Sequence, residues 1–245
     1  MNDDQLLRYS RQIMLPGVDL DGQLALADAR VCIVGAGGLG NPVGLYLAAA
    51  GVGHLTVIDD DVIELSNIAR QIAYTDEDVG ASKAEVLARE MRRRNPHVSV
   101  VAHSQRLTPQ NAAAMISGSQ VVVDCSDNYA ARFTINDACL ALAIPAIFAA
   151  ATAWQGQIFV TNPASAEHPC YECFNPSRDE LDASCARNGI LGPLVGMIAS
   201  QQAVEVLRLL LGLPAAPVLQ LYDGRDSQWH RIAMAPRAAC PCRSK

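Results

Sequence analysis

The sequence predicts an α/β fold with a Rossmann-like, mostly parallel sheet, helices on both faces, and an antiparallel C-terminal half. The first observation is that the apolar strand Val31–Val34 runs directly into the glycine-rich turn Gly35–Gly40. The second is that a helical segment then leads to another apolar strand, His54–Asp59, which completes a βαβ unit. The third is that the strand-like segments after Gly156 are typical of an antiparallel sheet.

Each element follows from the spacing of apolar residues and from the helix breakers between them. Asp3–Met14 has the apolar spacing of a helix, which Gly17 and the stretch Asp19–Gly22 interrupt. Asn95–Pro96 stops a long charged helix. After the first strand we expect, in chain order, a helix at Gly38–Gly51, the strand His54–Asp59, a loop or short helix at Asp60–Thr75, a helix at Val79–Arg94, a strand at Val98–Ala102, a short helix at Pro109–Ile116, a strand at Val121–Val123, a helix at Ala130–Ala143, strands at Ala146–Ala149 and Gln157–Thr161, a polar loop at Asn162–Gly192, a helix at Leu194–Leu211, and strands at Val218–Tyr222 and Trp229–Met234.

Composition limits the class of protein. Half of the 245 residues are apolar and 18% are charged, so the chain can bury a full core. The net charge of −6 argues against nucleic-acid binding. The N-terminus lacks a signal-peptide pattern, and the apolar runs are too short to span a bilayer. We expect a cytoplasmic protein without membrane contact, and one domain over residues 1–245 with a nucleotide-binding half at about 1–150 and a second half at about 151–245.

The glycine-rich turn predicts a nucleotide site. Gly35 permits a tight turn, Gly37 lets backbone N–H groups approach phosphate, and Gly40 lets the next helix pack close to the sheet. Phosphate would then lie at the start of the helix near Gly38. Asp59, nineteen residues after Gly40, would accept hydrogen bonds from ribose. The alternative is tight strand–helix packing without a ligand. Taken alone, the fingerprint indicates NAD.

Three polar residues directly after the second strand change this interpretation. Asn67, Arg70 and Lys83 provide an amide and two cations where a dinucleotide enzyme needs little charge. Such groups suit a triphosphate, whose transfer depends on charge neutralisation and positioning. Apart from the C-terminal residue, Lys83 is the only lysine of the chain. The alternative is a set of surface ion pairs with nearby acidic residues.

A polar cluster, Asp124-Cys125-Ser126-Asp127-Asn128, follows the strand at Val121–Val123. Ligand-binding groups of open α/β sheets gather at such carboxyl ends. Asp127 is placed to hold the Mg²⁺ of a triphosphate. Its alternative role is the N-cap of the helix that starts near Asn128, and Asp124 could take either position.

Eight cysteines in a large cytosolic chain favour metal binding or thiol chemistry over disulfides. Cys170-x-x-Cys173 has the spacing of half a structural zinc site. Cys32, Cys125 and Cys139 have apolar or strand-end neighbours, and we expect them to be buried.

Several motifs occur together in a fixed order. They are R-Y-S-R-Q-I (8–13), G-A-G-G-L-G (35–40), D-x-D (59–61), S-N-I-A-R-Q (66–71), Lys83, D-C-S-D-N (124–128), C-Y-E-C (170–173) and D-G-R-D-S-Q-W (223–229). Over essentially its whole length the chain resembles the ThiF/MoeB family, bacterial relatives of the ubiquitin-activating enzymes.

The resemblance implies an adenylyltransferase. Members use ATP to adenylate the C-terminal Gly-Gly carboxylate of a small ubiquitin-like sulfur carrier, ThiS or MoaD, and release pyrophosphate. By motif, the nucleotide would contact Gly35, Gly37, Gly38, Gly40, Asp59, Asp61, Asn67, Arg70, Lys83, Asp127 and Asn128. Asp127 would hold Mg²⁺, and Arg11 would reach the triphosphate of the partner subunit in a homodimer. The expected catalytic residues are Arg11, Arg70, Lys83, Asp127 and Cys185.

The cysteines depart from the family pattern in one place. The resemblance implies a Zn²⁺ site of two C-x-x-C pairs, here Cys170 and Cys173 with Cys240 and Cys242, whose pair is one residue shorter. The alternative is loss of the metal, or replacement of one ligand by His168. Cys185 matches the family's thiol that can link covalently to the carrier; the alternative is a neutral loop cysteine with Arg187 as its only cationic neighbour in sequence.

Three functions remain to be compared: adenylation of a sulfur carrier, an NAD-linked oxidoreductase, and a nucleotide-binding dimerisation module without turnover. The resemblance is slightly closer to thiamine-branch members than to molybdopterin ones, and Ala69 replaces the glutamine usual at its position. We expect the sulfur donor to be a separate protein.

Overall fold

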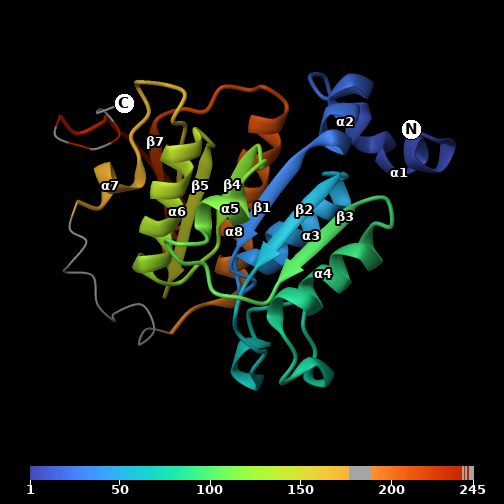
Figure 1. Ribbon diagram of the computed structural model, residues 1–245. Coiled ribbons are helices and arrows are strands. Elements are labelled where there is room, and N and C mark those ends of the chain that lie inside the picture. Colours follow the sequence, from blue (N-terminus) through green and yellow to red (C-terminus); the bar gives the residue numbers. More distant parts are fainter. Residues whose placement is uncertain (177–188, 239, 241, 243–245) are drawn as a thin grey trace.

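The computed structural model describes residues 1–176, 189–238, 240 and 242 (Figure 1). The strands form one sheet in the order β3-β2-β1-β4-β5-β6-β7-β8. They are β1 (Arg30–Val34), β2 (His54–Ile58), β3 (Ser99–His103), β4 (Val121–Asp124), β5 (Ala146–Thr152), β6 (Gln155–Thr161), β7 (Val218–Asp223) and β8 (Gln228–Ala233). The α-helices are α1 (Asp3–Ile13), α2 (Asp19–Asp28), α3 (Gly40–Ala50), α4 (Lys83–Arg94), α5 (Ala112–Ile116), α6 (Tyr129–Leu142), α7 (Tyr171–Phe174) and α8 (Gly192–Leu210).

The sheet has the predicted two-part architecture. Strands β3, β2, β1, β4 and β5 are parallel neighbours, whereas β6, β7 and β8 continue the sheet in antiparallel fashion. The carboxyl ends of five parallel strands therefore lie along one edge, where open α/β sheets bind ligands. The predicted fold class is confirmed. The same sheet runs through both halves of the chain, and the division of their roles stays a prediction.

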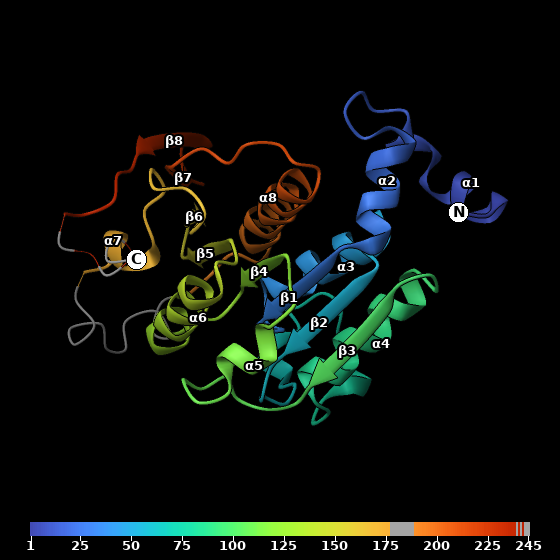
Figure 2. The same cartoon turned by 45° about the horizontal axis from the view of Figure 1, so that its top comes forward.

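Helices cover both faces, as Figure 2 shows. The side chains of β1 alternate between two cores: Val31 and Ile33 belong to the core that contains residues of α3, α4 and α8, while Cys32 and Val34 belong to the core under α5, α6 and α7. This alternation follows from the two-residue period of a strand. It explains why β1 reads as an uninterrupted apolar run in the sequence.

One predicted break is wrong. Asp19–Gly22 begins α2 instead of interrupting a helix. Two aspartates in its first turn complement the positive end of the helix. Gly22 is tolerated inside the helix because it lies against Leu211, whose Cδ2 would be only 2.9 Å from an added Cβ. Close packing, which spacing rules do not see, reverses the usual meaning of this glycine.

Two helices that border the site start later than predicted. Helix α3 begins at Gly40 and α4 at Lys83. Gly80 has a φ of +88°, and the Ser82 Oγ accepts a hydrogen bond from the Glu85 N–H at 3.4 Å as N-cap. Lys83 is therefore the first residue of its helix. In the part of the chain that the structure describes, each helix is too short or too polar to cross a membrane.

Candidate active site at the carboxyl ends of the parallel strands

The glycine turn between β1 and α3 is tightly packed at three of its positions. Gly35 has a φ of +96°, and a Cβ there would lie 2.5 Å from the Cys125 carbonyl oxygen. A Cβ at Gly40 would overlap the Gly35 carbonyl. At Gly38 it would meet Val195 of α8 at 2.9 Å. These positions require glycine for packing alone.

Gly37 is different. The nearest atom to a Cβ added there is the Gln71 Nε2, at 3.6 Å, which is an ordinary contact. Packing therefore does not explain this glycine. A group that approaches the backbone from outside would explain it, as the phosphate-binding interpretation requires.

Asp59 braces the turn. Its Oδ2 accepts a hydrogen bond from the Ala36 N–H at 2.7 Å, and its Oδ1 accepts one from the Asp61 N–H at 2.8 Å. Burial raises the pKa of Asp59, while these two hydrogen bonds and Lys83 oppose the rise. Each carboxylate oxygen can accept a second hydrogen bond, so a contact with ribose stays compatible with this arrangement.

Lys83 lies beside the turn with its ammonium group on Asp61. The Nζ–Oδ2 distance is 2.8 Å, and the Lys83 side chain is 10% exposed while that of Asp61 is 60% exposed. Of the acidic residues close to Lys83 in sequence, Asp78 pairs with Arg89 at 2.7 Å instead. The only internal lysine of the chain is thus held in a buried position at the edge of the glycine turn.

Asn67 and Arg70 belong to a compact turn before α4. Asn67 is buried, and its Oδ1 accepts a hydrogen bond from the Glu64 N–H at 3.1 Å. The Arg70 Nη1 donates to the Ser66 carbonyl at 3.0 Å. An added Cβ at Gly38 would lie 3.6 Å from the Arg70 Cγ, so Arg70 packs close to the glycine turn.

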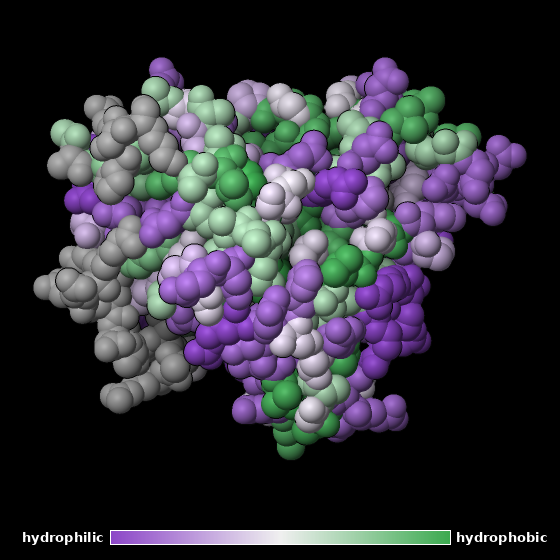
Figure 3. Space-filling view, viewed as in Figure 1, coloured by the Kyte–Doolittle hydropathy of each residue, from purple (hydrophilic) through white to green (hydrophobic). Residues whose placement is uncertain are grey.

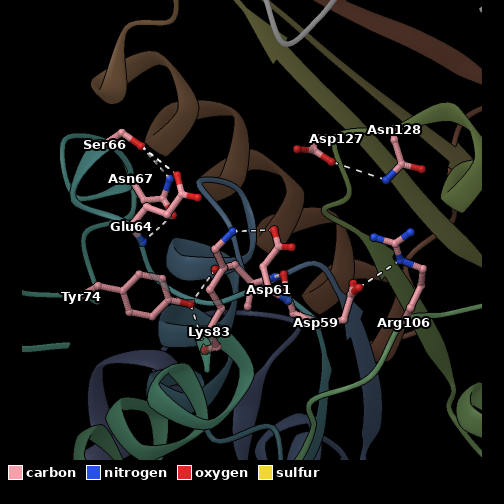
Figure 4. Close-up of polar contacts among 12 residues, drawn as sticks. Asp59, Asp61, Glu64, Ser66, Asn67, Tyr74, Lys83, Arg106, Asp127 and Asn128 are labelled. Atoms are coloured by element: carbon pink, nitrogen blue, oxygen red, sulfur yellow. Dashed lines mark hydrogen bonds and ion pairs between the residues drawn. The ribbon is translucent and has the colours of Figure 1, made fainter. Parts of the chain in front are cut away.

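Asp127 and Asn128 come from the loop after β4, as Figure 4 shows. The N-cap of α6 is Asn128, whose Oδ1 accepts a hydrogen bond from the Ala131 N–H at 2.9 Å. The alternative N-cap role of Asp127 is therefore wrong. Asp127 is exposed, and its Oδ1 accepts a hydrogen bond from the Asn128 Nδ2 at 3.4 Å.

Asp124 forms a buried pair that the sequence analysis missed. Its Oδ2 lies 3.3 Å from the Nε of Arg132, and both side chains are almost fully buried. The Arg132 Nη2 donates to the carbonyls of Ser126 and Ala149, at 3.0 and 3.2 Å. Burial raises the pKa of Asp124 to about 6 although Arg132 opposes the rise. The pair joins the loop that contains Asp127 to the middle of β5.

Other supporting residues were also missed. The Asn41 Nδ2 and the Tyr74 hydroxyl both donate to the Ala36 carbonyl, at 2.7 and 2.6 Å. Gln71 is buried, and its Oε1 has no hydrogen-bond partner among the described residues. The sequence does hold a signal for Asn41, because an amide in an otherwise apolar helix start needs a buried partner.

The structure does not bring Arg11 to this site within one chain. Helix α1 packs at the far end of α3, where Tyr9 lies against Gly51 and its hydroxyl accepts from the Asn95 Nδ2 at 2.7 Å. The glycine turn lies at the start of α3, whose eleven residues span about 16 Å at about 1.5 Å each. Arg11 is exposed at the end of α1.

The four predicted zinc ligands lie together. The sulfurs of Cys170, Cys173, Cys240 and Cys242 are all within 4.8 Å of one another. The Cys170–Cys240 and Cys173–Cys242 sulfur pairs are 3.3 and 3.6 Å apart. Tetrahedral zinc with bonds of about 2.3 Å places its sulfur ligands about 3.8 Å apart. The donor set therefore fits Zn²⁺ despite the shortened C-x-C pair, and His168 is not part of this cluster.

Two further expectations about cysteines have different outcomes. Cys185 lies outside the described residues. Cys32, Cys125 and Cys139 are buried free thiols, and burial raises the pKa of Cys32 to about 12. These three fill the core, as expected.

Comparisons with known proteins agree with the motifs. Residues 9–243 match the model of the ThiF family. The sulfur carrier protein ThiS adenylyltransferase of Escherichia coli is 43% identical over 98% of this chain and 96% of its own length. The molybdopterin-synthase adenylyltransferase of Escherichia coli is 39% identical over 98% of this chain and 97% of its own length. A crystal structure of E. coli MccB with ATP superposes with a TM-score of 0.81 at 25% identity, over 97% of this chain and 75% of that one. The chain belongs to the ThiF family.

Proposed function

We propose that this chain uses ATP to adenylate the C-terminal Gly-Gly carboxylate of a small ubiquitin-like sulfur carrier, forming an acyl-adenylate and releasing pyrophosphate. The observation that carries the proposal is the buried Lys83 at the edge of the braced glycine turn. That arrangement occurs in a chain 43% identical to an enzyme named for this reaction with ThiS. The carrier class is ThiS-like, with a MoaD-like carrier second, because the molybdopterin relative is 39% identical.

Lys83 and Arg70 would neutralise the negative charge of the reacting groups. A carboxylate that attacks the α-phosphate brings negative charge to a negative group, so the site must neutralise that charge. Lys83 is already desolvated, and Asp61, being largely exposed, can return to water when a triphosphate takes over the ammonium. Arg70 can exchange its contact with the Ser66 carbonyl for a forked contact with phosphate. The nucleophile is ionised at neutral pH and needs no general base.

Asp127 is the residue that would hold Mg²⁺. It is exposed, and among the described residues it is hydrogen-bonded to Asn128, whereas Asp124 is paired with Arg132. An exposed carboxylate at the carboxyl end of β4 suits an ion that also binds phosphate oxygens. Magnesium would supply further neutralisation of the triphosphate.

The four cysteines would hold a structural Zn²⁺. Cys170 and Cys173 lie at α7, and Cys240 and Cys242 lie near the C-terminus. A closed four-thiolate site adds folding stability without chemistry. Here it would fasten the C-terminal segment to α7.

Arg11 would act in a homodimer, on the triphosphate of the partner subunit. Two apolar surfaces favour association of two copies. Leu7, Met14 and Leu15 are exposed on and after α1, and Leu65 and Ile72 are exposed on the segment between β2 and α4. Figure 3 shows apolar atoms gathered at the lower end of the molecule, where Figure 1 places that segment. Docking of one copy's α1 near this segment of the other would bring Arg11 to the site.

Two parts of the proposal rest on sequence alone. Cys185 would form a covalent link with the activated carrier, and a separate protein would donate the sulfur. Loss of carrier-linked adduct in Cys185→Ser, with adenylation retained, is the result expected for this role.

Pyrophosphate exchange tests the main proposal. Labelled pyrophosphate should enter ATP only when a carrier ending in Gly-Gly is present, and a carrier lacking the last glycine should fail. ThiS-like and MoaD-like carriers measured in parallel identify the pathway branch. ATP binding without exchange with any carrier would instead support the dimerisation module, and hydride transfer with NAD would support the oxidoreductase. Family membership favours adenylation over both.

A further inference from the structure

The hydroxyl of Tyr74 lies between two main-chain carbonyls. Its oxygen is 2.6 Å from the Ala36 carbonyl oxygen and 3.0 Å from that of Lys83. Ala36 belongs to the glycine turn, and Lys83 begins α4. Tyr74 is buried, and Figure 4 shows it beside Lys83. The hydroxyl carries one hydrogen, which the nearer Ala36 carbonyl and the Lys83 carbonyl share. A single side chain therefore connects the two elements that would hold phosphate.

The Ala36 peptide is fixed from both sides. Its N–H donates to Asp59 at 2.7 Å, and its carbonyl accepts from Tyr74 and from the Asn41 Nδ2 at 2.7 Å. The Asn41 Oδ1 in turn accepts from the Ala73 N–H at 2.8 Å. The turn is thus attached to the segment that connects β2 with α4.

Lys83 is held at three atoms. Its N–H donates to the Asp61 carbonyl at 3.0 Å, its Nζ pairs with the Asp61 carboxylate, and its carbonyl shares the single Tyr74 hydroxyl hydrogen with the Ala36 carbonyl. A flexible lysine is normally a mobile point charge. Here the main chain from which it projects is tied to the turn.

We propose that Tyr74 is a positioning residue that fixes Lys83 relative to the glycine turn, so that the ammonium and the turn's N–H groups engage one triphosphate together. The inference rests on the proposed function in that the ligand is ATP. Tyr74 itself does not touch the nucleotide. It acts by holding two phosphate-binding elements in register, which reduces the reorganisation needed when ATP binds.

The stability of the fold does not require this hydroxyl. Without it, the Ala36 carbonyl keeps the Asn41 amide as a donor. The Lys83 carbonyl keeps the main-chain partner that a first-turn carbonyl has inside α4. Neither carbonyl would become an unsatisfied buried acceptor, so removing the hydroxyl separates positioning from folding.

Tyr74→Phe is the test, because it removes only the hydroxyl. The matched control is Tyr9→Phe, which removes a buried, hydrogen-bonded hydroxyl at the other end of α3. Calorimetry measures the affinity of each variant for a non-cleavable ATP analogue with Mg²⁺ and for adenosine, and thermal unfolding gives Tm. Neither binding measurement needs the carrier.

We expect Tyr74→Phe to bind the ATP analogue about five- to tenfold more weakly, with adenosine affinity unchanged and Tm close to that of Tyr9→Phe. Unchanged affinity for the ATP analogue overturns the inference. An equal loss for ATP analogue and adenosine also overturns it, because that pattern indicates general loosening of the site. Failure of the proposed function gives a separate result: the wild type binds ATP but shows no carrier-dependent exchange.

Discussion

The edge of the sheet at the carboxyl ends of the parallel strands and the C-terminal half of the chain are held together in different ways. At the carboxyl ends of β1, β2 and β4, buried and half-buried polar side chains hold main-chain groups, as Asp59, Tyr74 and Asn41 do for Ala36. In the C-terminal half, β8 is an exposed edge strand and the last described residues are gathered by sulfur atoms. The buried cluster there contains little besides Cys170, Cys173 and Cys240.

Because of this difference, we expect substitutions to affect the two regions in different ways. The region around the glycine turn should be sensitive to single polar groups and to single methyl groups, because hydrogen bonds and close main-chain contacts fix its positions. The region around the four-cysteine cluster should tolerate changes in side-chain shape, but its stability should depend on a bound metal. Four predictions test this contrast, from the largest expected effect to the smallest.

Lys83→Ala should cause the largest loss. It removes a desolvated cation from the edge of the glycine turn, and the Asp61 left behind is exposed enough to be solvated. We expect exchange activity, as kcat/KM, to fall about 10²- to 10³-fold, or about 3–4 kcal/mol, with an unchanged unfolding midpoint. Arg89→Ala, on the same helix but paired with Asp78, is the control and should retain activity. Comparable losses in both variants would contradict the assignment of Lys83.

Gly40→Ala and Gly37→Ala separate packing from ligand approach. A methyl group at Gly40 overlaps the Gly35 carbonyl, so we expect a loss of about 2–3 kcal/mol in the free energy of unfolding. Gly37 has room for a methyl group, so Gly37→Ala should cost less than about 1 kcal/mol in stability yet weaken ATP binding. Urea unfolding and nucleotide titration measure the two effects. Normal ATP affinity in Gly37→Ala would argue against phosphate at this position.

The sequence predicted β1, the glycine turn and β2 well because these features are local. The strand, turn and acid of β1 and β2 lie within thirty residues, so spacing alone indicates the Gly35–Asp59 unit. The sequence could not reveal that Arg132 pairs with Asp124. Asp127 lies in the same motif, and nothing in the local pattern says which of the two aspartates is buried. Tyr74 reads as an ordinary core aromatic until its hydroxyl is placed.

The four-cysteine cluster was harder to predict from the sequence, because its two halves lie far apart in the chain. The C-x-x-C pair is easy to see, but its partners lie about seventy residues away and have different spacing. Whether a C-x-C pair can close such a site depends on how the chain approaches α7, which no local pattern encodes. The start of α2 at Asp19 was missed for a similar reason, because Gly22 packs against Leu211 from the other end of the chain.

The buried pair Asp124–Arg132 predicts a pH dependence of stability. The pKa of Asp124 is raised to about 6 in the folded chain from an ordinary value near 3.8. A carboxyl with a raised folded pKa contributes stability that is present below its unfolded pKa and lost as pH rises through its folded pKa. Relative to Asp124→Asn, the wild type should therefore lose up to about 2–3 kcal/mol between pH 4 and pH 7.

Urea unfolding of the wild type and Asp124→Asn at several pH values measures this difference. Asp60→Asn is the control, because Asp60 is exposed and pairs with the exposed Arg106. A difference that stays constant across the range, or one that grows in favour of the wild type as pH rises, would show that Arg132 keeps Asp124 ionised down to low pH.

Metal removal should have the smallest effect on the reaction. The four sulfurs lie at α7 and the C-terminal segment, and none of the proposed phosphate-binding residues belongs to that cluster. We expect about one zinc per chain in the purified protein, and Cys240→Ser should lower both metal content and Tm. Carrier-dependent exchange at 25 °C should change less than about threefold, since the glycine turn is held by hydrogen bonds of its own. Cys139→Ser, a buried thiol outside the cluster, is the control and should keep its zinc. Less than about half a zinc per chain in the wild type would mean that the shortened C-x-C pair no longer binds metal.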